Sequence, residues 1–450
     1  MEYRSANYNL GPDGNNKEKR RISMNIPDSE KKRIVVVGGG FAGIQFIKSL
    51  GKENPFQVVL LDKNNYHNFQ PLMYQVATAG LEPDAIAAPL RRVFKGFQDF
   101  YFRMAEVNRV YPEDNCINTS IGRLRYDYLV IATGSRTNFY GMDEVKENSF
   151  PMKQIPEALD LRSKILQNYE EALLVNDPQE YESLLDIVIV GGGPTGVELA
   201  GAISELKRHV LPKDLPELDF QQMDIYLVEA APQLLNGMSK NASEKSLQYL
   251  RKFGVNVLLN TTVKAYDGYT VTFGDGKKIH TQTLIWAAGV MGNIIEGLNP
   301  EVIKGNRYHV DMFCRIKGYD NMYCIGDVAG MYTTDMPRGH VMVAQVAIQQ
   351  GKNVAKNLLR MNKHKQPEPF HYKDKGSMAT VGRNKAVVDL PGWKFAGIFA
   401  WFVWMFIHVL ALVGFRNKVM VFMNWIWNYF TYDRATRLII RPWVKVKKGI

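Results

Sequence analysis

Two glycine-rich segments carry the clearest chemical signal in this sequence. The spacing G-x-G-x-x-G occurs at residues 38–43 (GGGFAG) and again at residues 191–196 (GGGPTG). In this spacing the first glycine permits a tight turn, and the second lets the backbone approach a pyrophosphate. The helix that follows attracts the same anion with its N-terminal N–H groups and its dipole. Two such segments predict that the chain binds two dinucleotides.

The elements around the first segment are those that a dinucleotide site requires. Residues 33–37 form an apolar run typical of a strand buried on both faces, and residues 44–50 have the pattern of a helix. A second strand is predicted at residues 57–61 and ends in Asp62. An acid at this place is suited to bind a ribose hydroxyl. This context distinguishes a nucleotide site from a glycine turn that serves only helix packing.

The same order of elements recurs around the second segment. An apolar strand is predicted at residues 186–190, a helix beginning at residues 197–203, and a second strand at residues 224–228 that ends in Glu229. The distance from the last glycine to this acid is longer than in the first unit. We assign the extra length to an extended helix and loop over residues 206–219. The sequence therefore contains a duplicated α/β unit.

Further apolar strands end in small residues, which suit close approach of the backbone to a ligand. They are predicted at residues 128–134 and 283–289. Another strand, at residues 322–325, leads into Gly326-Asp327 ahead of a helix over residues 342–359. Asp327 is placed to accept hydrogen bonds from ribityl hydroxyls, although the dipeptide alone would also suit an ordinary turn.

The distribution of charge argues against nucleic acid as a partner. The net charge is +11, but eleven basic and two acidic residues from residue 376 onward contribute +9, and residues 1–33, with eight basic and five acidic, contribute +3. The last 75 residues also hold six of the seven tryptophans. Basic residues beside Trp and Phe are typical of a membrane interface. Three scattered cysteines predict neither disulfides nor a metal site, and favour a reducing compartment.

Two apolar stretches near the C-terminus predict contact with a membrane. Residues 395–415 contain His408 as their only ionisable side chain and are long enough to span a bilayer, and residues 419–430 are again apolar and aromatic. Basic residues flank both ends of the first stretch, which favours two helices lying in one leaflet over a span. A soluble dimer interface built from the same aromatic surface remains an alternative.

Taken together, these segments resemble the glutathione-reductase-like flavoproteins that bind two dinucleotides, and within them the type II NADH:quinone oxidoreductases. The resemblance covers about residues 32 to 450. Beyond the glycine motifs it rests on residues 69–77 (FQPLMYQVA), 191–201, 344–350 (AQVAIQQ) and 372–376 (YKDKG), and on the aromatic, basic C-terminus. The A-Q-x-A-x-Q-Q segment followed by that C-terminus is the part specific to the family.

The resemblance implies two bound cofactors, FAD and NADH, and no metal. The residues it assigns to FAD are Gly38, Gly40, Phe41, Ala42, Gly43, Asp62, Val107, Ala132, Thr133, Gly134, Gly326, Asp327, Ala344 and Gln345. The residues it assigns to NADH are Gly191, Gly193, Pro194, Thr195, Gly196, Glu198, Glu229, Ala288 and Gly289. Because Glu229 is followed by two alanines and no arginine, NADH is expected in preference to NADPH.

Each expected catalytic residue could also have a purely structural role. The resemblance places Glu198 beside nicotinamide and flavin, although a carboxylate in a first helical turn is also favoured by the dipole. Gln345 and Gln349, four residues apart, share a helix face and are suited to bond a quinone or the flavin rim, or else form a solvated face. Lys375 is either a donor toward the flavin or quinone, or a surface lysine. We expect His67 to be a packing residue.

The predicted fold is an α/β protein with two Rossmann-like domains and C-terminal amphipathic helices. The expected divisions are a disordered tail (1–30), a discontinuous FAD-binding domain (31–150 and 295–375), an NADH-binding domain (151–294) and a membrane-anchoring region (376–450). The resemblance implies oxidation of NADH and reduction of a membrane quinone at the cytoplasmic face of a bacterial inner membrane. The lipid surface is a further expected partner, and a homodimer is compatible with this.

Three other functions remain open from the sequence. A sulfide:quinone reductase would share the architecture, but it needs a pair of redox cysteines at the flavin, for which these three cysteines are poorly suited. A soluble reductase that passes electrons to an iron-sulfur protein is disfavoured by the C-terminal 75 residues. A membrane-tethered NADH sensor without turnover is the alternative from a different class.

Overall fold

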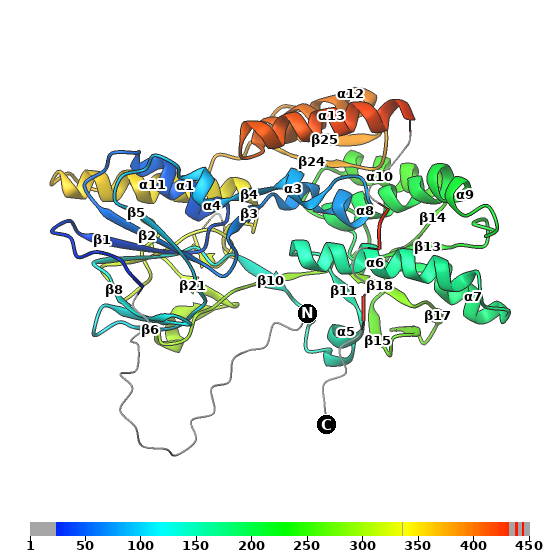
Figure 1. The fold of residues 1–450 in the computed structure, drawn as a ribbon, viewed down its shortest axis with the longest axis horizontal. Coiled ribbons are helices and arrows are strands. Elements are labelled where there is room, and N and C mark those ends of the chain that lie inside the picture. The colour runs from blue at the N-terminus through cyan, green and yellow to red at the C-terminus, as the bar shows by residue number, and fades with distance from the viewer. Residues whose placement is uncertain (1–23, 335, 432–436, 440–442, 445–450) are drawn as a thin grey trace, which may run out of the picture.

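The computed structural model describes residues 24–334, 336–431, 437–439 and 443–444. Its centre is a pair of five-stranded parallel sheets, one on each side of the molecule in Figure 1. The first sheet has the order β22-β9-β1-β2-β5. Its strands are β1 (Arg33–Val37), β2 (Gln57–Asp62), β5 (Phe100–Met104), β9 (Tyr128–Ile131) and β22 (Met322–Cys324). The central strands β1, β2 and β9 are buried along most of their length, as predicted for residues 33–37.

The second sheet repeats this arrangement with the order β11-β18-β12-β13-β14. Its strands are β11 (Phe150–Pro151), β12 (Ile187–Val190), β13 (Ile225–Val228), β14 (Val255–Leu258) and β18 (Thr283–Trp286). In each unit a three-stranded antiparallel sheet is inserted between the third and the last of the matching strands. These inserts are β6 (Val107–Tyr111), β7 (Cys116–Thr119) and β8 (Gly122–Arg125), and β15 (Val263–Tyr266), β16 (Thr270–Phe273) and β17 (Lys278–His280). The predicted duplication is therefore present in three dimensions.

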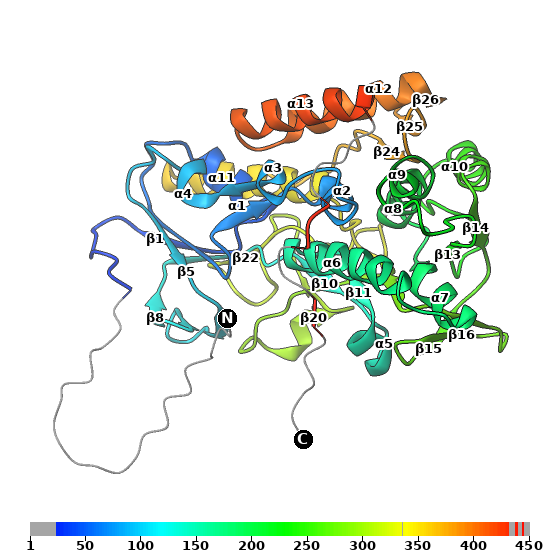
Figure 2. The ribbon, with the colours of Figure 1, turned by 45° about the vertical axis from the view of Figure 1, so that its right-hand side comes forward.

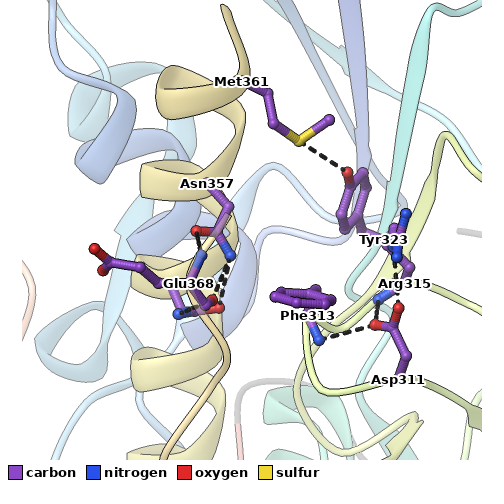
Figure 3. Close-up of polar contacts among 8 residues, drawn as sticks. Asp311, Phe313, Arg315, Tyr323, Asn357, Met361 and Glu368 are labelled. Carbon is purple, nitrogen blue, oxygen red and sulfur yellow. Dashed lines mark hydrogen bonds and ion pairs between the residues drawn. The ribbon is translucent and has the colours of Figure 1, made fainter. Parts of the chain in front are cut away.

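Two helices pack closely against each other on the first sheet. They are α1 (Phe41–Leu50) and α11 (Ala344–Asn362). A Cβ atom on Gly351 of α11 would lie 2.5 Å from the carbonyl oxygen of Ala42, so only glycine allows this approach. The segment after α11 is fastened to it by Asn357, whose side chain bonds both the N–H and the C=O of Glu368 (Figure 3).

The helices of the second unit explain the long distance between its glycines and its acid. Helix α8 (Pro194–Glu205) continues into a π-helical turn at Leu206–Val210 and then α9 (Leu211–Asp214) before β13 begins. The predicted helix and loop over residues 206–219 are thus confirmed, with helical turns to Asp214 and a loop over residues 215–219. The other helices of this unit are α5 (Asp143–Asn148), α6 (Ile155–Ala172), α7 (Pro178–Leu185) and α10 (Lys240–Lys252).

A short two-stranded sheet carries the chain between the two units. Strand β10 (Ser135–Thr137) leaves the first unit and pairs antiparallel with β19 (Val290–Gly292), which returns to it. Thr133 and Asn293 lock this crossing, because each bonds the main-chain oxygen of the other, at 2.6 and 3.1 Å. The pairing therefore brings together the segments that follow β9 and β18.

Several short elements complete the first unit. They are β3 (Tyr66–Asn68), a 3₁₀ turn (Gln70–Leu72), α2 (Met73–Ala77), α3 (Pro83–Ile86), β4 (Ala87–Pro89), α4 (Leu90–Val93), a second 3₁₀ turn (Pro300–Val302), β20 (Ile303–Lys304), β21 (Arg307–His309) and β23 (Ala329–Gly330). The prediction of a disordered tail over residues 1–30 is wrong at the C-terminal end of that tail. Met24 is buried, and Arg103 donates hydrogen bonds to the carbonyl oxygens of Met24 and Asn25. Residues 1–23 lie outside the described part of the chain.

The C-terminal region is a small antiparallel sheet covered by two helices. The strands are β24 (Ser377–Thr380), β25 (Ala386–Leu390) and β26 (Trp393–Gly397), followed by α12 (Ile398–Ala411) and α13 (Phe415–Thr431). Both views show the two helices along one outer edge of the molecule (Figures 1 and 2). The apolar stretch at residues 395–415 is therefore not one helix, because its first residues form β26. Among the described residues, none of the helices has the length and apolarity that crossing a bilayer requires.

The tryptophans of this region are not all at its surface, which corrects their assignment to a membrane interface. Trp404 and Trp425 are buried in one core with Ile187 and Ile225 of the second sheet. Trp443 packs against Phe150, with ring centroids 5.1 Å apart. These rings join the C-terminal region to the rest of the fold.

Candidate functional site

The first glycine segment is tightly packed on one side and open on the other. Gly38 has φ +109°, and a Cβ there would lie 2.3 Å from the oxygen of Ala132 at the end of β9. A Cβ on Gly43 would lie 2.0 Å from the oxygen of Gly38. A Cβ on Gly40 meets no protein atom within 4 Å. Gly40 is the position at which backbone approaches a pyrophosphate, so the open space matches the bound nucleotide that the sequence predicts.

The second segment reproduces this geometry. Gly191 has φ +112°, and its Cβ would lie 2.9 Å from the main chain of Ala287 at the end of β18. A Cβ on Gly196 would lie 1.9 Å from the oxygen of Gly191, whereas one on Gly193 meets nothing within 4 Å. Each unit therefore has two glycines required by packing and one glycine that faces free space at the N-terminus of a helix, where an anion is attracted.

The acids after the second strands contact the glycine segments directly. Asp62 accepts the N–H of Gly39 at 2.7 Å, and Glu229 accepts the N–H of Gly192 at 2.5 Å. The second carboxylate oxygen of each acid accepts an N–H two residues onward, from Asn64 and Ala231. Burial raises the pKa of Asp62, partly offset by these hydrogen bonds. Both acids are therefore held at the edge of the open glycine, where a ribose would lie.

Gly326 and Asp327 follow β22 at the same edge of the first sheet. The N–H of Gly326 donates to Oε1 of Gln350 at 2.8 Å, which ties this turn to α11. Asp327 accepts from the Ser135 hydroxyl at 2.5 Å and lies 3.8 Å from Nζ of Lys153. Burial lowers the pKa of Lys153, against the raising effect of Asp327. Lys153 was not identified from the sequence, since it lies in a loop outside every motif.

Gln345 and Gln349 share a face of α11, but their amides bind the main chain of residues 373–376. Gln345 donates to the oxygen of Gly376 at 2.8 Å and accepts from the N–H of Lys375 at 3.2 Å. Gln349 makes the same pair of bonds with Lys373, at 2.8 and 3.0 Å. The two glutamines thus hold the segment that leads into the C-terminal region.

The remaining expected residues lie in more ordinary surroundings. The Lys375 side chain is exposed, as the surface-lysine reading predicts. Ala344 is the first residue of α11, and Val107 begins β6, half-buried against the core of the first unit. Ala288 and Gly289 follow β18, and a Cβ on Gly289 would lie 2.1 Å from the Tyr140 hydroxyl.

Glu198 lies in the first turns of α8 and is fully buried. It lines a cavity of about 110 Å³ between α8, α2 and the C-terminal helices. The N–H of Thr380 donates to Oε1 of Glu198 at 3.4 Å. Burial raises the pKa of Glu198 to about 8, and the Thr380 N–H and the Trp404 side chain only partly offset this effect. At neutral pH the side chain is therefore a protonated carboxylic acid that can give up a proton.

The same cavity contains residues that sequence reasoning missed. Gln75 of α2 accepts a hydrogen bond from the Trp425 indole at 2.8 Å, and Tyr74 packs against Trp404 with centroids 6.5 Å apart. Both residues belong to the LMYQVA segment that carries the family resemblance, but no spacing rule pairs them with tryptophans about 330 to 350 positions away. The fold alone places α12 and α13 over Glu198.

His67 is buried, as expected of a packing residue. Its Nδ1 contacts the oxygen of Gly39 at 3.2 Å, and its ring meets that of Phe41 edge-on at 4.9 Å. Burial lowers the pKa of His67 to about 4, so the ring is neutral.

Comparison with known proteins identifies the family. Residues 32–351 match the pyridine nucleotide-disulphide oxidoreductase family, and residues 374–432 match the NDH2 C-terminal domain. Two type II NADH:quinone oxidoreductases of Mycobacterium tuberculosis, Ndh and NdhA, are 33% and 34% identical. The alignments cover 90% and 88% of this chain and 89% and 86% of the relatives. The chain belongs to the type II NADH:quinone oxidoreductases.

Solved structures agree with this family assignment at the level of the fold. The structure of NDH2 from Plasmodium falciparum in complex with NADH superposes with a TM-score of 0.83 at 22% identity, covering 92% of this chain and 100% of that one. The sulfide:quinone oxidoreductase of Aquifex aeolicus gives a TM-score of 0.70 at 19% identity, covering 89% and 95%. The type II oxidoreductase fold is therefore the nearer of these two.

The cysteines of this type II oxidoreductase do not suit sulfide chemistry. Cys116, Cys314 and Cys324 are all free and buried. Burial raises the pKa of the Cys314 and Cys324 thiols, which opposes formation of the reactive thiolate. In the part of the chain that the structure describes, no cluster of side chains suits a metal ion.

Proposed function

We propose that the protein binds FAD and NADH in its two nucleotide units and transfers electrons from NADH to a membrane quinone. The observation that carries this proposal is the repeated geometry of the units. In each, an acid bonds a glycine N–H beside an open glycine, Asp62 near Gly40 and Glu229 near Gly193. Two nucleotides held in one chain, across the crossing of β10 and β19, are what a nicotinamide-dependent flavoprotein requires.

We assign FAD to the first unit and NADH to the second. The first unit offers Asp327 in addition to Asp62, and so a second carboxylate for a ribityl chain. When bound, FAD supplies the two-electron chemistry that the side chains of this site do not provide. The proposed FAD unit comprises residues 31–150 and 295–375 and the NADH unit residues 151–294, with β11 at Phe150–Pro151 already in the second sheet.

We propose that Glu229 selects NADH over NADPH. Its carboxylate lies against Gly192 and would bond the ribose hydroxyls of NADH, whereas it would repel a 2′-phosphate. The next two residues are Ala230 and Ala231, so no adjacent cation compensates that repulsion.

We assign Glu198 to proton supply. Reduction of a quinone to a quinol by NADH consumes one proton from the surroundings. A buried carboxylic acid with a pKa of about 8 holds a proton at neutral pH in a cavity that the C-terminal helices cover. Gln345 and Gln349 act in this proposal by fixing residues 373–376, and Lys375 contributes through its main-chain N–H.

We propose that the apolar face of α12 and α13 docks on a lipid bilayer. Large apolar side chains on these helices are exposed, and they follow the spacing of one helix face. We call the following residues the docking face: Ile398, Phe399, Phe402, Phe406, Leu410, Phe415, Val419, Phe422, Met423, Ile426, Trp427 and Phe430. An exposed patch of this kind marks a membrane or protein contact. The proposed location is the cytoplasmic face of a bacterial-type membrane, where NADH is available.

Anaerobic spectroscopy of the purified protein tests the proposed reaction. Addition of NADH should bleach the flavin absorbance, and a soluble quinone should restore it, whereas NADPH should act much more slowly. Bleaching by sulfide instead of NADH would favour a sulfide oxidoreductase, and binding of NADH without bleaching would indicate a sensor. For the docking face, a protein that dimerises in solution and ignores vesicles would indicate a protein interface in place of a membrane contact.

A further inference from the structure

One lysine of the second unit reaches into the first unit beside the proposed FAD site. Lys153 lies between β11 and α6, which belong to the second unit (Figure 1). Its ammonium group lies 3.8 Å from a carboxylate oxygen of Asp327 and donates to Oε1 of Gln70 at 3.3 Å. Asp327 follows β22 and Gln70 begins the 3₁₀ turn before α2, so both partners belong to the first unit. Lys153 is therefore a cation that the second unit supplies to the first.

The main chain holds Lys153 in this position. Its N–H donates to Oε2 of Glu157 at 2.6 Å, and its oxygen accepts from Nε2 of Gln70 at 3.1 Å. The same Glu157 oxygen also accepts the N–H of Gln154, as part of a capping box at the start of α6. Gln70 therefore binds both the main chain and the side chain of Lys153, and the protein itself fixes the position of the ammonium group.

The ammonium group of Lys153 has more donors than the protein uses. An ammonium group carries three N–H donors and no acceptor. Among the described residues, Gln70 is the only hydrogen-bond acceptor of this group, because the Asp327 oxygen at 3.8 Å is beyond hydrogen-bonding distance. The side chains of Lys153 and Asp327 are only 17% and 18% exposed, and burial lowers the pKa of Lys153. Two donors of a largely buried cation are thus available to a ligand.

The surroundings of Asp327 indicate which ligand these donors would meet. Asp327 accepts a hydrogen bond from the Ser135 hydroxyl at 2.5 Å and lies at the edge of the first sheet where Gly40 faces free space. We assign this carboxylate to the ribityl chain of FAD. FAD carries hydroxyl, carbonyl and phosphate oxygens, and each of these accepts a hydrogen bond from an ammonium group. FAD therefore matches Lys153, whereas NADH is assigned to the open Gly193 of the other unit.

We propose that Lys153 is an FAD-binding residue that the NADH unit contributes to the FAD site. Its ammonium group donates to an oxygen of FAD next to Asp327, while Gln70 keeps the lysine in place. FAD is then bound by both units, and the second unit is held against the first where electrons pass between the two cofactors. This role rests on the proposed assignment of FAD to the first unit and NADH to the second. A lysine that only joined the units would need no unused donors.

Release of FAD from the purified holoprotein tests this role. Lys153→Met should release FAD about tenfold faster or more, the scale of a lost charge-assisted hydrogen bond, as followed by the rise in flavin fluorescence on dilution. The Kd for NADH should stay unchanged, because Gly193 and Glu229 are untouched. Lys153→Arg keeps the charge and should release FAD nearly as slowly as the unaltered protein. If Lys153→Met does not fold, Lys153→Gln takes its place with the same expectation.

Two further variants separate FAD binding from a purely structural role. Gln70→Leu removes both hydrogen bonds to Lys153 but leaves the ammonium group, so FAD release should change much less than in Lys153→Met. Lys164→Met is the matched control, because Lys164 lies on α6 and its ammonium group donates to Gln282 of its own unit at 3.2 Å. Its release of FAD should be unchanged. Equal acceleration in Gln70→Leu and Lys153→Met would overturn the proposal in favour of a contact that only joins the units.

Failure of this proposal and failure of the proposed function give different results. Unaltered protein that purifies without FAD, or whose flavin NADH does not bleach, would contradict the proposed function. Lys153→Met that retains FAD as firmly as the unaltered protein, and whose flavin NADH still bleaches, would contradict only the role of Lys153.

Discussion

Thr380 donates its backbone N–H to the carboxyl group of Glu198 at 3.4 Å, across 182 positions of the sequence. This contact joins α8 of the second nucleotide unit to β24 of the C-terminal region. Gly201, one turn further along α8, permits the approach, because its Cβ would lie 2.8 Å from the nitrogen of Gly382. The acid that we assign to proton supply is thus covered by the C-terminal region, which we propose to dock on the membrane.

The raised pKa of Glu198 predicts a pH-dependent stability. Between pH 4.5 and about 8 the unfolded state loses this proton while the folded state keeps it, so folding stability falls as pH rises. Above pH 8 the loss is complete and reaches roughly 5 kcal/mol. Glu198→Gln cannot ionise. The melting temperature of this variant relative to the unaltered protein should therefore rise between pH 5 and pH 8.

Comparing the variant with the unaltered protein removes the contribution of other titrating groups to the pH dependence, because both proteins contain them. Burial raises the pKa of Asp186 to about 7, but Asp186 is present in both proteins. A difference in melting temperature that does not change with pH would mean that Glu198 is ionised in the folded protein. It would then not serve as a proton donor at neutral pH.

Valine at the two open glycines should remove one nucleotide each without disturbing the fold. Gly40 and Gly193 have φ of −76° and −73°, which valine can adopt, and a Cβ at either meets no protein atom within 4 Å. Gly40→Val should purify with little flavin. Gly193→Val should keep its flavin but need at least about tenfold more NADH, since one displaced phosphate contact costs over 1 kcal/mol.

The ratio of flavin to protein absorbance and the KM for NADH check these variants. Gly43→Ala serves as a contrast, because its Cβ would lie 2.0 Å from the oxygen of Gly38 and should impair folding itself. Full flavin occupancy in Gly40→Val would contradict the assignment of FAD to the first unit.

Replacement of Glu229 should weaken NADH binding and leave flavin content unchanged. Glu229→Ala removes the ribose acceptor and also the acceptor of the Gly192 and Ala231 N–H groups, so we expect a loss of about 1 to 3 kcal/mol. Glu229→Gln retains one acceptor oxygen and should lose less. Both variants should discriminate less strongly against NADPH, as measured by kcat/KM. An unchanged KM for NADH in Glu229→Ala would refute the assignment.

Replacing Gln345 and Gln349 together by leucine should release residues 373–376. Four hydrogen bonds are lost, at about 1 kcal/mol each, so the melting temperature should fall. Trypsin should then cleave faster at the exposed Lys373 and Lys375. Stopped-flow reduction of the flavin by NADH should persist. If stability and cleavage stay unchanged while reoxidation by quinone slows, the two amides contact the quinone directly.

Serine at four phenylalanines of the docking face should abolish vesicle binding but preserve the nucleotide sites. Phe399, Phe406, Phe422 and Phe430 are at least half exposed, so their removal leaves the core intact. The four-serine variant should no longer sediment with vesicles, whereas it should still transfer electrons from NADH to ferricyanide. Leu174→Ser is the control, because Leu174 is 82% exposed just after α6, away from α12 and α13. Unchanged sedimentation of the four-serine variant would mean that another surface meets the membrane.

Substitutions are preferable to deletion of the C-terminal residues from 392 onward. Trp404, Val421 and Trp425 are buried in the same core as Leu199 of α8, so the deletion would expose that core. The sequence predicted a membrane-anchoring region at residues 376–450, because tryptophan and basic residues are typical of an interface whether the individual rings face lipid or protein. Only the packing separates the buried rings from exposed ones such as Trp427.

The sequence by itself determined the two nucleotide units, because their requirements are local. A tight turn, an open glycine and a helix N-terminus follow one another within six residues, and the buried strands beside them are continuous apolar runs. The acids Asp62 and Glu229 were identified for the same reason. Each lies at the end of the second strand of its unit, which pairs with the strand that precedes the glycines.

Tertiary structure alone decided what surrounds Glu198 and where the glutamine amides bind. Glu198 has a raised pKa because it is buried among residues from distant parts of the chain, and the hydrogen bonds from Thr380 and Trp404 offset this effect only in part. Periodicity correctly placed Gln345 and Gln349 on one helix face, but it does not specify the partner of that face. The partner was residues 373–376, because an amide and a peptide group satisfy each other's donors and acceptors when the fold brings them into register.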